Sequence, residues 1–195
     1  MNHAQSNHAF SAFVEALKMR NEINPSKDNE IALSYLEKNE KAIKAGMIKF
    51  PESVISQIIE NQKIESKASD NFVAVKVNVK IVHCLAAMGL NMRSMFDKYS
   101  MSIIRNLIEL QGLDNLNAQR SICSKIEIDE LQISQNVKVY HNCNPSTAST
   151  QTSSTREMLR HLDLAHAIKR AKADKISIKD NKHADTLISM FATTV

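Results

Sequence analysis

The sequence predicts a mainly α fold: a multi-helix, bundle-like core followed by a C-terminal helix-turn-helix or winged-helix-like unit with a small β-hairpin. Two observations favour helices. The 195 residues include only 3 Gly and 3 Pro, too few for the many tight turns of a β-sandwich or barrel. Apolar residues also recur at spacings of three and four along most of the chain, which is typical of amphipathic helices. The hydrophobic fraction of 43% is sufficient for a folded core.

Three helices are predicted in an N-terminal helical region, residues 1–66. The first spans residues 8–20, where Phe and Leu side chains recur at helical spacing. The second spans roughly residues 27–45, and Gly46 is expected to end it, since glycine commonly follows the last helical residue. A third, short helix begins after Pro51, because proline fits the first turn of a helix.

A helical core is predicted for residues 67–124. Its first segment, FVAVKVNVKIVHCLAAM at residues 72–88, alternates β-branched and polar residues like a strand but also forms an apolar helix with one polar stripe. We predict the helix, because no turn signal interrupts the segment before Gly89. A long helix over residues 92–110 and a short helix over residues 114–124 follow, each with apolar residues at helical spacing.

The remaining residues, 125–195, are predicted to form a basic C-terminal helical unit. Residues 126–140 fit either a β-hairpin or several helical turns, and the sequence leaves both open. The segments AIKRAKAD and KISIKD, residues 167–180, are expected to pair as a basic hairpin. Apolar residues at helical spacing then predict a final helix over residues 181–191.

The segment STASTQTSST, residues 146–155, contains only hydroxyl residues apart from one Ala and one Gln. Its first half, which follows Pro145, is typical either of a solvated linker or of an ordered turn. Its second half runs into Ser154-Thr155-Arg156-Glu157, a capping-box pattern in which Ser and Glu bond the free amides of a first helical turn. The pattern predicts that a helix begins at Ser154.

Positive charge is concentrated at the carboxyl end of the chain. The formal net charge is +4, but residues 1–155 carry 17 Lys or Arg against 16 Asp or Glu, whereas residues 156–195 carry 8 against 5. A balanced body with a basic end indicates an anionic partner for that end. The interpretation depends on these cations lying together and not being neutralised by neighbouring carboxylates.

The order helix, polar turn, helix, basic hairpin, helix across residues 114–191 resembles the architecture of a helix-turn-helix with a wing. We therefore predict a small DNA-binding, regulatory protein that acts as a homodimer. The side chains expected to contact bases and phosphates are Thr150, Gln151, Ser153, Arg156 and Arg160. Those expected to hold the DNA backbone from the wing are Lys169, Arg170 and Lys172.

The alternative prediction is a non-enzymatic helical protein–protein interaction module, such as an adaptor, an inhibitor or an assembly subunit. Its basic end would then meet an acidic protein surface. For either class we expect a cytoplasmic protein without a membrane partner, since no leader is visible and the longest apolar segment is interrupted by Lys76, Asn78 and Lys80.

We expect no enzymatic activity, no cofactor and no metal. Glycine-rich phosphate loops, GxSxG and HExxH motifs are absent from the sequence. Cys84, Cys123 and Cys143 are widely spaced and few, which is typical of a reduced, intracellular protein. His141 and Cys143 lack a second ligand pair at zinc-binding spacing.

Overall fold

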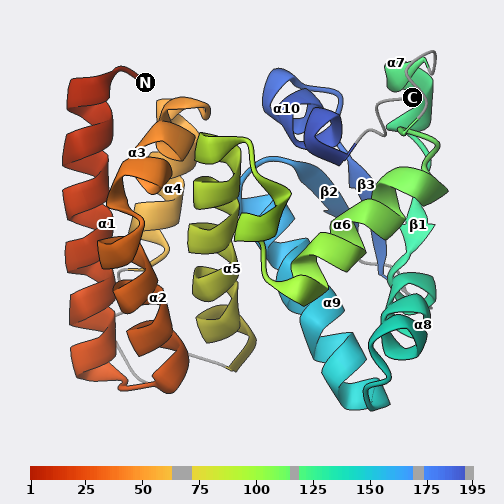
Figure 1. Cartoon of the computed structure of the whole chain (residues 1–195), viewed down its shortest axis with the longest axis horizontal. Coiled ribbons are helices and arrows are strands. Elements are labelled where there is room, and N and C mark those ends of the chain that lie inside the picture. The colour runs from red at the N-terminus through yellow and green to blue at the C-terminus, as the bar shows by residue number, and fades with distance from the viewer. Residues whose placement is uncertain (63–71, 115–118, 169–173, 192–195) are drawn as a thin grey trace. The chain divides into compact units, whose positions relative to one another are not determined.

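The computed structural model describes residues 1–62, 72–114, 119–168 and 174–191. The chain divides into two compact units, Met1–Phe96 and Asp97–Val195, with the boundary inside the predicted core region 67–124. Both are built mainly from helices, and the second also contains a small antiparallel sheet (Figure 1). Within the described residues, no helix combines the length and the apolar character needed to cross a membrane.

The first unit is helical throughout its described residues (Figure 1). Its helices are α1 (His3–Ile23), α2 (Lys27–Lys38), α3 (Glu40–Ile48), α4 (Glu52–Glu60), α5 (Phe72–Leu90) and the short 3-10 helix η2 (Arg93–Met95). Side-chain caps account for two of the starts. Asn2 and Gln5 form a reciprocal capping box at the start of α1, and the Ser26 hydroxyl accepts a bond from the amide of Asn29 at the start of α2.

The structure confirms a helix over residues 72–88, since α5 runs from Phe72 to Leu90. The single helix predicted for residues 27–45 is wrong, because Asn39 leaves helical geometry (φ −121°, ψ 25°) and separates α2 from α3. The predicted helix ends at Gly46 and Gly89 are also wrong. Both glycines lie inside their helices, α3 and α5.

These two glycines allow α3 and α5 to pack with their backbones in close approach. A Cβ added at Gly46 would lie 1.9 Å from the carbonyl oxygen of Leu85, and one added at Gly89 would lie 1.9 Å from the carbonyl oxygen of Ala42. Atoms this close overlap, so neither position accepts a side chain unless the helices separate. Both glycines are therefore explained by close packing between α3 and α5, and not by the end of a helix.

We expect Gly46→Ala to lower the free energy of unfolding by about 1–3 kcal/mol, the usual effect of overpacking a core. Intrinsic helix propensity predicts the opposite sign, since Ala stabilises a helix interior by about 1 kcal/mol relative to Gly. Urea denaturation followed by circular dichroism distinguishes the two. A Gly46→Ala protein more stable than the wild type would contradict the close contact.

The second unit combines helices with three short strands (Figure 1). In chain order it contains α6 (Lys98–Leu110), α7 (Arg120–Cys123), β1 (Ile128–Asp129), α8 (Glu130–His141), α9 (Pro145–His161), β2 (Ala165–Ile168), β3 (Lys175–Ile178) and α10 (Lys182–Phe191). Helix α9 packs against α6, α8 and β2, and α6 also contacts α8, α10 and β3. The apolar side chains of α6 that these contacts bury are Ile103, Ile104, Leu107 and Ile108.

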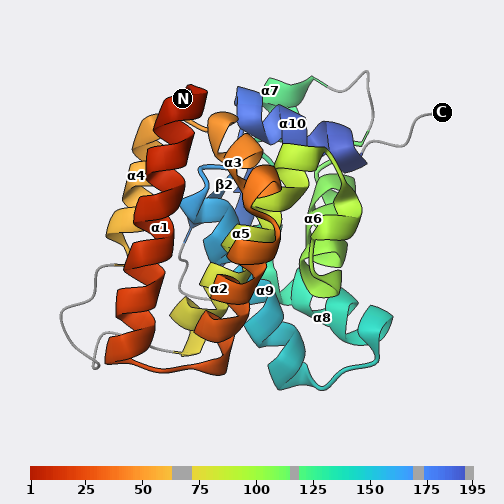
Figure 2. The same ribbon diagram turned by 60° about the vertical axis from the view of Figure 1, so that its left-hand side comes forward.

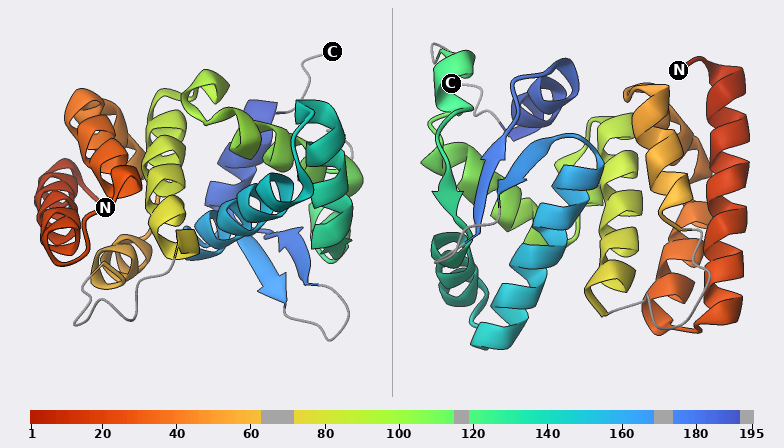
Figure 3. Two further views of the ribbon diagram at one scale, coloured as in Figure 1. Left: turned by 90° about the horizontal axis from the view of Figure 1, so that it is seen from below. Right: turned by 180° about the vertical axis from the view of Figure 1, so that it is seen from behind.

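The strands form an antiparallel sheet in the order β1-β3-β2, with β3 in the middle (Figure 3). Ile176 of β3 pairs with Ile128 of β1 and with Ala167 of β2. The basic hairpin predicted over residues 167–180 is confirmed as the pair β2 and β3, with its connection at residues 169–173 outside the described residues.

The predicted helix over residues 92–110 is confirmed only in part. It is replaced at its start by η2, and α6 begins after Asp97, whose carboxylate accepts bonds from the amides of Tyr99 and Ser100. For the prediction over residues 114–124, the described part contains the single-turn helix α7, while residues 115–118 lie outside it. The predicted final helix is confirmed as α10.

The alternatives left open for residues 126–140 are resolved as a two-residue strand, β1, followed by helix α8. The hairpin is therefore wrong for this segment. Strand β1 pairs with β3, nearly fifty residues later in the chain. Such long-range pairing leaves no turn signal next to the strand, which explains why local patterns do not reveal it.

Candidate nucleic-acid interface

The hydroxyl-rich segment is neither a linker nor a turn. It forms one continuous helix, α9, that begins nine residues before the predicted start at Ser154. The side chain of Asn144 caps the first turn by accepting a bond from the amide of Thr147 at 2.7 Å, and Pro145 occupies the first helical position. Ser154 is buried inside this helix, so the capping-box interpretation of residues 154–157 is wrong.

Helix α9 buries hydroxyl groups on its inner side because each has a partner within the helix. The hydroxyls of Thr152, Ser154 and Thr155 donate to the carbonyl four residues earlier, at 2.9, 2.8 and 2.8 Å respectively. The Thr155 hydroxyl also lies 3.2 Å from that of Ser100 on α6. Satisfied in this way, hydroxyl groups can enter a core without the penalty of an unpaired polar group.

A three-residue turn joins α8 to α9. Asn142 ends α8 in the left-handed conformation (φ 45°), which asparagine tolerates better than most residues. The amide of Cys143 donates to the carbonyl of Lys138 at 3.2 Å, and Asn144 then caps α9. The two helices pack against each other, so α8, the turn and α9 form a compact pair of helices (Figure 2).

The outer side of α9 carries short polar side chains in its first half. Ser146 and Ser149 are exposed, whereas the predicted contact residues Thr150, Gln151 and Ser153 are half-buried. Neither exposed serine was among the predicted contacts. The signal that reveals them is the start of the helix at Pro145, since helical spacing from there places both serines opposite the buried side.

The hydroxyl of Ser153 faces α8. It donates to the carboxylate of Glu130, the first residue of α8, at 2.6 Å. Thr150 and Gln151 contribute carbonyls to the bonds within the helix described above. Thr150, Gln151 and Ser153 therefore lie on one helix, but only part of each side chain is exposed.

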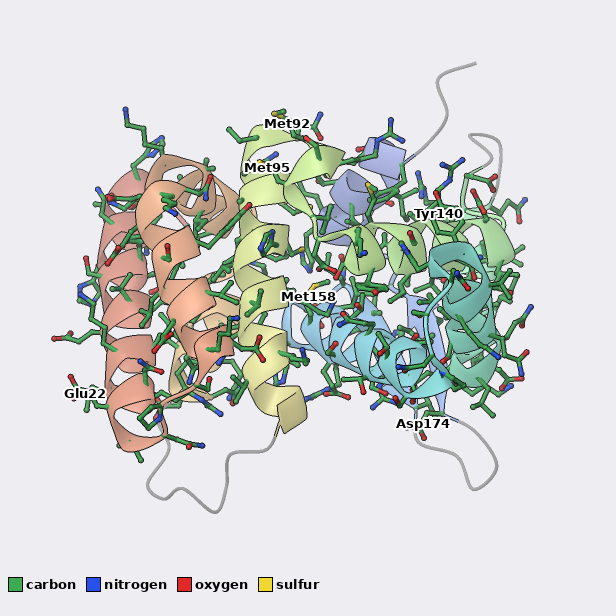
Figure 4. The ribbon with its side chains drawn as sticks, turned by 60° about the horizontal axis from the view of Figure 1, so that its bottom comes forward. Glu22, Met92, Met95, Tyr140, Met158 and Asp174 are labelled. Atoms are coloured by element: carbon green, nitrogen blue, oxygen red, sulfur yellow. The ribbon has the colours of Figure 1, made fainter. Side chains whose placement is uncertain are left out.

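Arg156 lies at the centre of a cluster with three carboxylates, which we call the Arg156 cluster: Arg156, Glu130, Asp174 and Glu157. Its guanidinium binds Glu130, Asp174 at 2.5 Å and Glu157 at 3.0 Å, and its side chain is only 12% exposed. Asp174 stands immediately before β3, next to the hairpin connection (Figure 4). Its backbone carbonyl also accepts a bond from the amide of Glu130 at 2.9 Å.

Charges within this cluster shift its pKa values in the directions that favour ionisation. Burial alone would lower the pKa of the Arg156 guanidinium, but Glu130, Asp174 and Glu157 together raise it above its ordinary value. Burial would likewise raise the pKa of Glu157, but Arg160 and Arg156 lower it below its ordinary value of 4.5. These shifts hold Arg156 and Glu157 in their ionised forms.

The other described cations near α9 are paired too. Arg160 binds Glu157 at 2.7 Å, Lys175 binds Asp129 at 2.6 Å, and Lys179 binds a carboxylate oxygen of Asp163. The predicted backbone contacts Lys169, Arg170 and Lys172 lie outside the described residues. Four of the five cations that the structure describes in residues 156–195, Arg156, Arg160, Lys175 and Lys179, are therefore bound to carboxylates.

Other groups with reactive or metal-binding chemistry are scattered. Burial raises the pKa of the Cys84 thiol, which disfavours the reactive thiolate. Cys123 and Cys143 are free and half-buried. Where the structure describes the chain, it contains no group of three or more His, Cys, Asp or Glu side chains that could hold a metal ion.

Comparisons of the chain with protein-family models, with curated proteins and with solved structures give no match. Any function proposed for the chain therefore rests on its own elements and side chains.

We expect Arg156→Met to lower the free energy of unfolding by about 2–4 kcal/mol, because it leaves Glu130 and Asp174 close together without their cation, while Glu157 keeps Arg160. Arg160→Met is the matched control on the same helix. The Arg160 side chain is 48% exposed, so its pair contributes only about 0–1 kcal/mol. Equal losses in the two variants, measured by urea denaturation, would contradict a structural role for the Arg156 cluster.

Stability should fall in acid, partly through Glu157. The pKa of Glu157 in the folded state is lowered below 4.5, so the unfolded chain binds its proton more readily than the folded chain does. The stability that Glu157 contributes is therefore fully present above pH 4.5 and is lost as the pH falls through the folded-state pKa. Glu157→Gln should therefore lose stability less steeply than the wild type between about pH 6 and about pH 3. Glu37→Gln, at an exposed position of α2, is the control and should keep the wild-type slope.

Proposed function

We propose that the second unit is a winged-helix unit that binds duplex DNA. What supports this is the order of its elements: helix α6, the single-turn helix α7, strand β1, helices α8 and α9, strands β2 and β3, and helix α10, with a sheet of order β1-β3-β2. A helix-turn-helix followed by an antiparallel hairpin that closes such a sheet is the arrangement of a helix-turn-helix with a wing. The proposal rests on this order and not on the charge count.

In this proposal α9 is the recognition helix. The second helix of a helix-turn-helix lies in the major groove and directs its N-terminal residues at the base edges. The first half of α9 presents the exposed Ser146 and Ser149, with the half-buried Thr150 beside them. Their short side chains would allow the helix backbone to lie deep in the groove.

Arg156 takes a different role from the one predicted from the sequence. We propose that it positions the hairpin against α9 through Asp174 and does not contact DNA, because its guanidinium is occupied by carboxylates. The phosphate contacts then fall to the hairpin connection, where Lys169, Arg170 and Lys172 stay as predictions. A symmetric homodimer, also a proposal, would present two copies of α9 to successive turns of the duplex.

The proposal is tested by fluorescence anisotropy with a labelled duplex. The wild-type chain should bind at low salt and lose affinity steeply between about 50 mM and about 200 mM salt. Ser149→Glu, which places a negative charge on the exposed face of α9, should weaken binding about tenfold or more. Ser56→Glu makes the same change at an exposed position of α4 in the first unit and should leave affinity within about twofold.

A protein-interaction module is the second candidate, and one observation favours it. Leu131, Val139 and Tyr140 on α8 are 60%, 80% and 77% exposed, and Tyr140 lies near the end of that helix (Figure 4). Val139 and Tyr140 are neighbours near the end of α8, whereas Leu131 stands near its start, and exposed apolar side chains that lie together are typical of a contact surface. Two results together would favour this function over DNA binding. The wild type would not bind duplex DNA at low salt, and Leu131→Lys or Val139→Lys would abolish self-association measured by light scattering.

A further inference from the structure

We infer that the second unit carries a site for single-stranded nucleic acid, in which a base stacks on the ring of Tyr140 while lysines of α6 and α8 bind the neighbouring phosphates. This site lies on α6 and α8, whereas the proposed duplex contact lies on α9. It is formed by three aromatic rings in mutual contact, one of them largely exposed, with cations around them.

The three rings meet where the end of α8 contacts the start of α6. The ring of His141 lies 4.6 Å from that of Tyr99 and 4.9 Å from that of Tyr140, measured between ring centroids. Tyr99 and His141 are half-buried, whereas Tyr140 is 77% exposed (Figure 4). We call these three residues the aromatic cluster. Most of the Tyr140 ring is therefore open to a planar group that could stack on it.

Hydrogen bonds hold the central ring of the aromatic cluster in place. The Ser102 hydroxyl donates to the carbonyl of Lys98 at 3.0 Å, so Nε2 of His141, which lies 2.9 Å from that hydroxyl, donates to it. Burial and the charge of Lys98 lower the pKa of His141 below its ordinary value of 6.5, so the ring is uncharged at neutral pH. A surface that is already ordered loses little conformational freedom when a ligand binds.

Two exposed lysines stand beside the aromatic cluster. Nζ of Lys98 lies 5.0 Å from the centroid of the Tyr99 ring, and Lys138 belongs to the last turn of α8. Within the part of the chain that the structure describes, neither lysine is bound to a carboxylate. The chain also has no Asp or Glu between Glu130 and Glu157. Both lysines are therefore available to an anionic partner.

The carboxylates of α6 and its cap do not cancel this charge. Asp97 accepts bonds from the first amides of α6, and Glu109 binds Arg105 at 2.8 Å. The cations Lys98, Arg105 and Lys138 outnumber these two carboxylates. A second copy of the chain would bring the same lysines to a symmetric contact, so like charges oppose self-association through this surface.

Single-stranded nucleic acid supplies both groups that this surface fits. Proteins that bind single strands combine aromatic rings, on which bases stack, with cations that bind the phosphates. In a duplex each base is already stacked on its neighbours, so a ring on a helix surface meets no free base face. In a single strand the bases can turn outward and stack on an aromatic side chain. The combination of Tyr140 with unpaired lysines therefore favours a single strand.

The experiment measures binding of the full chain to labelled oligo(dT) and oligo(U) of about 12 nucleotides at low salt, by fluorescence anisotropy. Tyr140→Leu should weaken the affinity about tenfold, whereas Tyr140→Phe keeps the ring and should stay within about twofold of the wild type. Leu131→Ala is the matched control at a 60% exposed position of the same helix, and it should also stay within about twofold. The tighter of the two probes identifies DNA or RNA.

Tyrosine fluorescence and salt dependence give two further readouts. The chain has 3 Tyr and no Trp, so a base stacked on Tyr140 should quench part of the emission. Tyr140→Phe should lose that quenching and keep its affinity. Lys98→Gln and Lys138→Gln should each reduce the slope of log affinity against log salt by about 0.7.

Failure of the wild type to bind either probe at low salt, or an unchanged affinity in Tyr140→Leu, would overturn the inference. Loss of self-association in Tyr140→Leu, without any single-strand binding, would assign the surface to a protein partner and overturn it too. None of these results bears on the duplex contact of α9, which Ser149→Glu tests separately.

Discussion

The second unit depends on one guanidinium, that of Arg156, which joins three separate segments. It binds Glu130 at the start of α8, Asp174 immediately before β3, and Glu157 on α9 itself. The backbone bond from the amide of Glu130 to the carbonyl of Asp174 reinforces the same junction. Because the carboxylates are mostly buried with their cation, removing one member would leave the others without compensation. The cluster therefore fixes where the hairpin lies relative to α9.

Hydroxyl side chains lie on both the buried side and the exposed side of helix α9. On its inner side, hydroxyls such as that of Thr152 bond carbonyls of their own helix and can be buried. On its outer side, Ser149 faces solvent, and the hydroxyl of the exposed Ser146 donates to the side-chain oxygen of Asn144 at 2.8 Å. The same residue type thus supports packing against α6 and α8 and provides the polar surface on which the proposed DNA contact depends.

The parts that local patterns predict correctly are those whose burial follows from their own periodicity. Helix α5 is apolar around most of its circumference, and the pair β2 and β3 consists of short β-prone segments separated by a connection of a few residues. Glycine was misleading in this respect. Glycine is common just after the last residue of a helix, so Gly46 and Gly89 predicted helix ends. The contact between α3 and α5 instead requires both glycines inside their helices.

The sequence by itself determined the mainly helical class, the C-terminal hairpin, and the presence of a hydroxyl-rich segment at residues 146–155. Only the tertiary structure decided where α9 begins, which hydroxyls are buried, and that Arg156 binds carboxylates and not solvent. The physical reason is distance along the chain. Helical periodicity depends on residues three and four positions apart. The partners of Arg156 outside α9 are Glu130 and Asp174, which stand 26 and 18 residues away and contact it only when the chain is folded.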